Sequence, residues 1–173
     1  MNHTVLNIVM SYLGWFACVW GAAHQRPLLG PLVLLLVLGV HFFLMPNAAR
    51  EARLLVMAGL LGFSLDTAQA ALGAFAFHGT GMSTWVSPPW MIALWLNFAT
   101  TLRTSLNWLT GRYVLAMLLG VLSGPLSYYA GAQLGALILH ANVTLSMLAV
   151  AAAWGGAMPL LVWLAHRPDD RRS

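Results

Sequence analysis

Hydrophobic residues dominate this chain in long runs that short polar segments interrupt. Each run approaches or exceeds the roughly 20 residues that a helix needs to cross a bilayer. Because the connections are short, neighbouring helices are predicted to run antiparallel. We therefore predict an all-α, polytopic transmembrane bundle of about six helices, over the ranges Val5–Ala23, Leu28–Met45, Leu54–Phe77, Pro89–Trp108, Tyr113–Leu139 and Val143–Ala165.

Composition leaves little room for anything outside the membrane. The 173-residue chain is 60% hydrophobic and 7% charged, whereas about 25% of the residues of a soluble domain are charged. We therefore expect a single integral-membrane domain over residues 1–173. The net charge of +4 comes from arginines beside the hydrophobic runs rather than from a basic face, so nucleic acid is not a predicted partner.

Arginine positions predict the orientation, because positive charge is enriched in cytoplasmic loops. In a six-crossing arrangement one side receives Arg50, Arg53, Arg112, Arg167, Arg171 and Arg172, whereas the opposite loops receive Arg26. Both termini are therefore predicted to be cytoplasmic. Tryptophans near predicted boundaries are interpreted as membrane anchors, namely Trp85, Trp90 and Trp108. The apolar runs show no convincing internal repeat, so an inverted-repeat transporter is not indicated.

Polar residues inside two of the runs mark a candidate site. Asp66 falls near the middle of its predicted span, where a carboxyl costs about 2.5–3.5 kcal/mol and needs a polar partner. Asn97 in the next span falls at about the same depth. We predict a polar cavity bordered by Asn97 and by the region near Pro125, with the ligand-binding residues Asp66, Gln69, Asn97, Thr101, Arg103, Ser127 and Tyr128. The alternative is an Asp66 that only fastens helices together.

The fifth run combines a small-residue face with a proline. Its glycines recur every three or four residues and share one helical face with Ser127, at Gly120, Gly124, Gly131 and Gly135. We interpret this face as a packing seam within the chain, the alternatives being a homo-oligomer interface or a docking face for a membrane-protein partner. Pro125 removes a backbone hydrogen bond and is expected to kink or break the helix over residues 123–129.

A second candidate is a polar cluster at the cytoplasmic boundary, formed by His41, Glu51 and Arg103. Arg103 would reach this boundary by extending its side chain along the helix. The alternative is that Arg103 is an ordinary boundary residue that belongs to no cluster. On the outer side the histidines His24, His78 and His140 show no metal-ligand spacing, so no metal and no cofactor are predicted. A single cysteine excludes an intramolecular disulfide.

Two sequence runs resemble a known family. The segments PWMIALWLNFATTL (89–102) and GPLSYYAG (124–131), together with His41, Glu51 and Asp66, resemble the uncharacterised bacterial inner-membrane family catalogued as domain of unknown function 2878. The likeness extends over nearly the whole chain. It implies a bacterial inner-membrane setting and, more loosely, an association with genes of fatty-acid or lipid modification. It brings no established activity.

Three functions are consistent with these observations. The first is a protein that binds or transports a small apolar or amphipathic, lipid-like molecule in an intramembrane polar cavity, with membrane lipid as its partner. The second is an accessory subunit of a membrane complex that docks through the glycine-rich face. The third is an intramembrane enzyme of lipid modification that uses Asp66 or the boundary cluster as acid and base. We favour the first, because buried polar residues indicate function while the sequence shows no catalytic motif.

Overall fold

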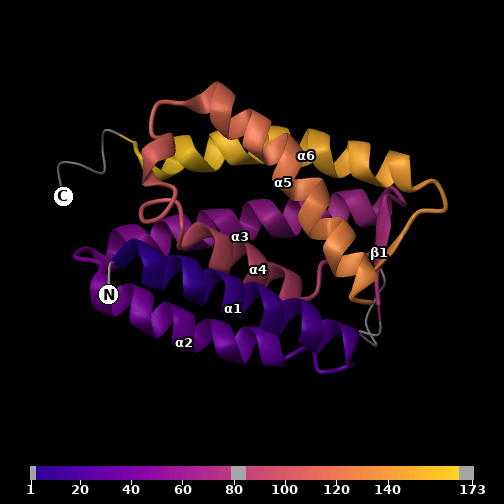
Figure 1. Ribbon diagram of the computed structural model, residues 1–173, viewed down its shortest axis with the longest axis horizontal. Helices are drawn as coiled ribbons and strands as arrows, with labels where there is room; N and C mark the ends of the chain where they lie inside the picture. The colour runs from indigo at the N-terminus through magenta and orange to yellow at the C-terminus, as the bar shows by residue number, and fades with distance from the viewer. Residues whose placement is uncertain (1–2, 79–84, 168–173) are drawn as a thin grey trace.

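The computed structural model describes residues 3–78 and 85–167. Within these residues the predicted all-α architecture is confirmed (Figure 1), and the longer helices run between the same two ends of the bundle, with α5 crossing the others obliquely. The pair α5 and α6 lies on one side of the bundle, α1 and α2 on the other, and α3 and α4 between them. The elements are α1 (His3–Ala23), α2 (Leu29–Leu44), α3 (Ala48–Ala71), β1 (Phe75–Phe77), α4 (Pro89–Ala99), the 3₁₀ helix η1 (Asn107–Leu109), α5 (Tyr113–Gln133), β2 (Leu137–Leu139) and α6 (Val143–Ala165).

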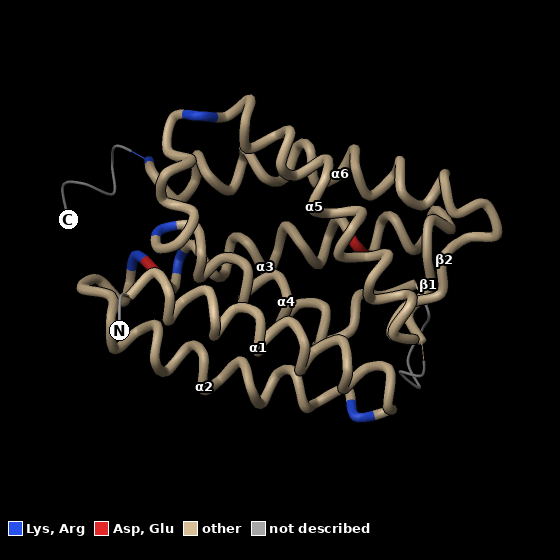
Figure 2. The backbone as a smooth tube through the Cα atoms, in the orientation of Figure 1, with Lys and Arg blue, Asp and Glu red and all other residues tan. Residues whose placement is uncertain are grey.

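Four helices, α1, α3, α5 and α6, are long and apolar enough to cross a membrane, whereas α2 and α4 are shorter. Figure 2 shows that the arginines gather at the end of the bundle where α1 begins and α6 ends, which we call the arginine end. One basic segment lies at the opposite end, at the turn between α1 and α2. We call that opposite end, which also carries β1 and β2, the strand end. Arg171 and Arg172 lie outside the described residues.

Two runs that were predicted as helical throughout end in strands instead. α3 ends at Ala71 and α5 at Gln133, and β1 and β2 then pair antiparallel at the strand end. Each helix stops at a glycine with positive φ, Gly73 at +79° and Gly135 at +90°, a conformation that terminates helices and favours glycine. Because the residues after each glycine are also apolar, hydrophobicity alone could not separate strand from helix.

The fourth predicted helix is shorter than expected. α4 ends at Ala99, and turns connect it to η1. Three threonine hydroxyls donate to backbone carbonyl groups here, Thr100 to Asn97, Thr101 to Phe98 and Thr104 to Thr100, at 2.6–2.7 Å. Such local bonds compete with regular helix. The irregular backbone is tolerated because Thr100, Thr101 and Leu102 are buried within protein.

Pro125 was predicted to kink or break the helix over residues 123–129, and the break does not occur, because α5 continues as one helix through Pro125. α6 likewise contains Pro159. A proline removes one N–H donor from a helix, and helices of membrane proteins accommodate this loss when neighbouring helices support them. α5 has that support, because Gly120 and Gly124 bring it into close contact with Trp154 of α6.

Residues around the strands reveal an internal repeat that the apolar runs did not show. The units α3–β1–α4 and α5–β2–α6 follow one another in the chain. Each contains Leu-Gly-Ala before its strand, at residues 72–74 and 134–136, and a histidine directly after the strand, His78 and His140. Figure 1 shows that α3 and α5 both run from the arginine end to the strand end. The two copies are therefore parallel repeats rather than inverted ones.

The strand pairing obeys the same repeat. Ala76 pairs with Ile138 at the centre of the ladder. Matching backbone hydrogen bonds flank it, from His78 N to Ala136 O and from His140 N to Ala74 O, each at 3.3 Å. When each residue is replaced by its counterpart in the other copy, His78 by His140 and Ala136 by Ala74, one of these hydrogen bonds becomes the other. A local two-fold axis therefore passes through the Ala76–Ile138 pair.

Candidate functional site

Asp66 is the fully buried carboxyl of the bundle interior, and two aromatic side chains hold it. Trp95 Nε1 donates to Asp66 Oδ2 at 2.7 Å, and the Tyr128 hydroxyl donates to Asp66 Oδ1. The three residues come from α4, α3 and α5, so the carboxyl joins both copies of the repeat. Because α3 ends at Ala71, Asp66 lies in the last two turns of its helix and not near the middle of a span.

Two glycines make room for the rings beside Asp66. Gly62 lies so close to Trp95 that a Cβ there would overlap the indole ring, and Gly124 faces Trp154 in the same way. The two indoles stack on each other, with centroids 4.5 Å apart and an angle of 15° between the ring planes. Each glycine precedes Asp66 or Tyr128 by one helical turn. The centre of the protein is thus a stacked tryptophan pair held by one glycine from each repeat.

An inner cavity of about 180 Å³ lies against this centre. Trp95 and Tyr128 form part of its wall. Asp66 lies behind this wall, because both of these side chains donate a hydrogen bond to its carboxyl. The remaining lining residues come from α1, α4, α5 and α6, namely Ser11, Trp15, Met91, Leu94, Asn97, Phe98, Ser123, Ser127 and Trp154. Its volume is several times the roughly 30 Å³ that a water molecule occupies in the liquid.

A larger groove of about 740 Å³ adjoins the inner cavity between α1 and α5. The two spaces share part of their lining, namely Ser11, Trp15, Phe98, Ser123 and Ser127. The groove opens on the outer surface of the bundle, where Tyr12 and Leu126 on its rim are about 70% exposed (72% and 69%). Trp15 Nε1 donates to Ser127 Oγ at 2.9 Å and so bridges the two helices where cavity and groove meet.

The boundary cluster of His41, Glu51 and Arg103 is assembled at the arginine end. Glu51 is buried; its Oε2 lies 3.0 Å from His41 Nε2, and its Oε1 accepts from Arg103 Nη1 at 3.0 Å. Arg103 also donates to the backbone oxygens of Ala165 at 2.7 Å and Arg50 at 3.1 Å. The cluster therefore ties α2, α3, α6 and the segment after α4 together.

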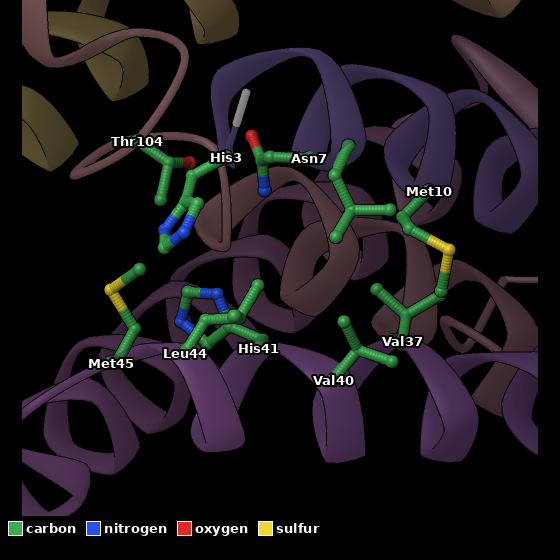
Figure 3. Close-up of a pocket in the computed structure, with 10 residues that line it drawn as sticks. His3, Asn7, Met10, Val37, Val40, His41, Leu44, Met45 and Thr104 are labelled. Atoms are coloured by element: carbon green, nitrogen blue, oxygen red, sulfur yellow. The ribbon is translucent and has the colours of Figure 1, made fainter. Parts of the chain in front are cut away.

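A small pocket of about 20 Å³ lies beside this cluster. Figure 3 shows the imidazoles of His3 and His41 on neighbouring walls, with Asn7 and Thr104 nearby and aliphatic and methionine side chains around them. Such a volume holds a water molecule and nothing much larger. The pocket therefore leaves room for a water molecule beside His41 but no space for an organic substrate.

The seven predicted ligand-binding residues do not form one site. Asn97, Ser127 and Tyr128 line the inner cavity, and Thr101 lines the groove. Asn97 also donates from Nδ2 to Ser11 O at 2.8 Å and packs on Gly14. The others lie elsewhere: Asp66 behind the wall, Arg103 in the boundary cluster, and Gln69 in a buried position where its amide has no hydrogen-bond partner among the described residues.

The glycine-rich face of α5 is mostly an intrachain contact. Gly120 and Gly124 pack on Trp154 of α6, and Gly131 approaches Leu137. Gly135 was placed on the same face, but it lies beyond the end of α5 in the turn before β2, because its positive φ ends the helix. Helix α6 therefore covers the part of the face that allows the closest helix contact.

The predicted outer histidines make local contacts. His24 stacks on Trp20 and its Nδ1 lies 2.9 Å from Trp20 O. His140 Nδ1 accepts from Asn142 N at 3.0 Å, and the His78 N–H belongs to the ladder.

Sequence reasoning missed the tryptophans of the inner cavity. It considered Trp85, Trp90 and Trp108 as boundary anchors, but Trp90 is buried against Phe77 and only the other two are exposed. Trp15 and Trp154 were passed over because indoles count as apolar residues in a hydrophobic run, and Trp95 entered only as part of the run that resembles the family. A signal was present, since each falls well inside a predicted span, where an indole N–H needs a hydrogen-bond acceptor.

Four helices that are long and apolar enough to cross a membrane, packed around a buried carboxyl and beside a groove that opens through the apolar surface, indicate the class of helical membrane proteins. Within that class, the chain belongs to the family described as protein of unknown function (DUF2878), which it matches over residues 4–160. The resemblance found in the sequence is thereby confirmed. No curated protein and no solved structure matches the chain.

Proposed function

We propose that this protein binds a lipid-like amphipathic molecule, which enters sideways from the bilayer through the groove and places its polar end in the inner cavity. The observation that carries this proposal is the continuity between the two spaces. Five residues line both the groove, which opens on the apolar surface, and the cavity beside Trp95 and Tyr128. A molecule with an apolar chain and a small polar end matches both environments.

The chemistry of the lining supports an amphipathic ligand rather than a wholly apolar one. Rim residues such as Ile8, Tyr12 and Leu126 present apolar surface to a chain. Deeper in, Ser123 and Ser127 present hydroxyl groups, and Tyr128 presents a phenol that Asp66 orients. Ligand pockets in general combine a mostly apolar lining with a few fixed polar groups.

We further propose that the chain crosses the bacterial inner membrane six times with both termini in the cytoplasm. In this arrangement α4 and residues 100–109 together make the fourth crossing, and α2 is completed by its flanking residues. The arginine end then faces the cytoplasm, consistent with the enrichment of positive charge in cytoplasmic loops. The cluster of His41, Glu51 and Arg103 would hold the cytoplasmic ends of the helices together.

Native mass spectrometry of gently extracted protein tests the binding proposal. Ser127→Trp places a large ring where groove and cavity meet, and Ser64→Trp places the same ring on the exposed surface of α3. We expect a co-purified lipid-like mass on the wild type and on Ser64→Trp, with most of it absent from Ser127→Trp, whose folding is checked separately by circular dichroism because it loses the hydrogen bond to Trp15. Equal ligand content in the two folded variants would contradict the proposal.

A further inference from the structure

Aromatic rings make up much of the wall of the inner cavity. Trp15, Trp95, Phe98, Tyr128 and Trp154 come from four different helices and all line the same space. The face of an aromatic ring carries negative charge density, and it attracts cations most strongly where water is excluded. Several rings around one cavity are the arrangement by which proteins recognise ammonium groups.

The ionisable group that lies behind the cavity wall is an acid. Among the described residues that line the cavity or the groove, none is Lys, Arg, His, Asp or Glu. The nearest ionisable acid behind the wall is Asp66, and its two hydrogen-bond donors, Trp95 and Tyr128, are neutral. When ionised, this carboxylate is a buried charge that no cation among the described residues of its own site compensates, and it is relieved either by a proton or by a cation that approaches through the cavity.

The same two hydrogen bonds carry the effect of Asp66 to the cavity. Trp95 and Tyr128 donate to the carboxyl and also form part of the cavity wall. A donor that binds an anion is polarised by it, so the rings of Trp95 and Tyr128 become more electron-rich. The carboxylate therefore acts on the contents of the cavity without touching them.

We infer that the polar end of the ligand is an organic cation, a quaternary or primary ammonium group, for which Asp66 is the counter-ion behind the aromatic wall. This inference rests on the proposed function and adds the chemical class of the ligand. An ammonium group in the inner cavity completes the buried charge pair, while its alkyl chain occupies the groove. The cavity, at about 180 Å³, has room for such a group.

Anionic and neutral ligands fit these observations less well. A phosphate or carboxylate end would need Arg, Lys or several N–H donors, and the described lining supplies no basic side chain. A neutral alcohol suits Ser123 and Ser127, but it makes no use of the aromatic wall or of an ionised Asp66. The alcohol is therefore the competing outcome in the test.

The test measures binding of three probes with the same chain, hexadecyltrimethylammonium, hexadecanol and hexadecyl phosphate, to the full protein in uncharged nanodiscs. Binding to Ser127→Trp is subtracted, because it reports partition into the bilayer. We expect the cation to bind at least about tenfold more tightly than the alcohol, and Asp66→Asn to remove most of that preference. Tyr129→Phe, whose ring lies on the exposed side of α5, serves as the control and should keep it.

Each outcome is decisive. A stronger affinity for the alcohol or the phosphate, or a cation preference that persists in folded Asp66→Asn, overturns the inference. If all three probes bind equally, the inference fails while the proposed function stands; if none binds to the cavity, both fail. Should Asp66→Asn not fold, Phe98→Leu decides, because loss of that ring should reduce the cation preference about threefold, and an unchanged preference would overturn the inference.

Discussion

Asp66 and Tyr128 are 62 residues apart, which is the offset between the two copies of the internal repeat, and their side chains are hydrogen-bonded to each other. The same offset relates Gly62 to Gly124 and the glycine that ends α3 to the one that ends α5. One position of the repeat thus carries a carboxyl in the first copy and a phenol in the second. The repeat brings the two together across its local axis.

This relationship predicts the effect of removing one hydroxyl group. Tyr128→Phe leaves Asp66, which is fully buried, with one side-chain donor, and this should lower the free energy of unfolding by about 1–3 kcal/mol. Tyr129→Phe is the matched control, because Tyr129 is adjacent on α5 and 45% exposed. Thermal unfolding in detergent measures both. Equal stability of the two variants would mean that the hydrogen bond to Asp66 contributes nothing.

Close packing at Gly62 predicts a second effect. An added Cβ there overlaps the ring of Trp95, which is held between that glycine, Trp154 and Asp66 and cannot move freely. Gly62→Ala should therefore destabilise the protein by about 1–3 kcal/mol. Gly39→Ala on α2 meets no atom within 4 Å and should be neutral or stabilising, because alanine favours helix. If both variants unfold at the same temperature, the placement of Trp95 against α3 is wrong.

The boundary cluster predicts a third effect. Glu51→Gln preserves size but removes the charge that His41 and Arg103 share. Breaking a buried ion pair costs about 3–5 kcal/mol, because the remaining charge is left uncompensated. Arg112→Gln, at an exposed position of the same end, should change stability by less than about 0.5 kcal/mol. A Glu51→Gln protein as stable as Arg112→Gln would contradict the structural role given to the cluster.

Orientation is tested with single cysteines in a Cys18→Ser background, since Cys18 is the native cysteine and is buried. His24 and Thr110 are exposed at opposite ends of the bundle. With both termini cytoplasmic, an impermeant maleimide added to spheroplasts should label His24→Cys and should label Thr110→Cys only after permeabilisation. The reverse pattern would invert the topology.

Much of the architecture could be predicted from the sequence because long apolar runs leave few alternatives to helices in a membrane. The boundary cluster was also predictable, since the arrangement of the runs brings His41, Glu51 and Arg103 to one end. Part of the inner cavity followed from the polar residues Asn97, Ser127 and Tyr128. Both predictions rested on polar residues whose depth in the bundle follows from their position along a hydrophobic run.

The rest depends on features that hydrophobicity does not report. The strands after Gly73 and Gly135 have the same apolar composition as the helices before them. The repeat escaped notice because its copies share few letters, and even its central position differs, with Asp66 in one and Tyr128 in the other. That Trp95 and Tyr128 separate Asp66 from the cavity is a matter of side-chain packing, which spacing along a helix does not determine.

The central claim, that a lipid-like molecule occupies the groove and the inner cavity, is tested most directly by photolabelling. An alkyl amphiphile with a diazirine in its chain is added to the protein in nanodiscs and irradiated, and the modified residues are mapped by peptide mass spectrometry. We predict that the chain labels residues of the groove and cavity, chiefly Tyr12, Trp15, Phe98 and Leu126, and that excess unlabelled amphiphile or Ser127→Trp removes these adducts. Labelling spread evenly over the outer faces of α2, α3 and α6, without competition, would contradict the account.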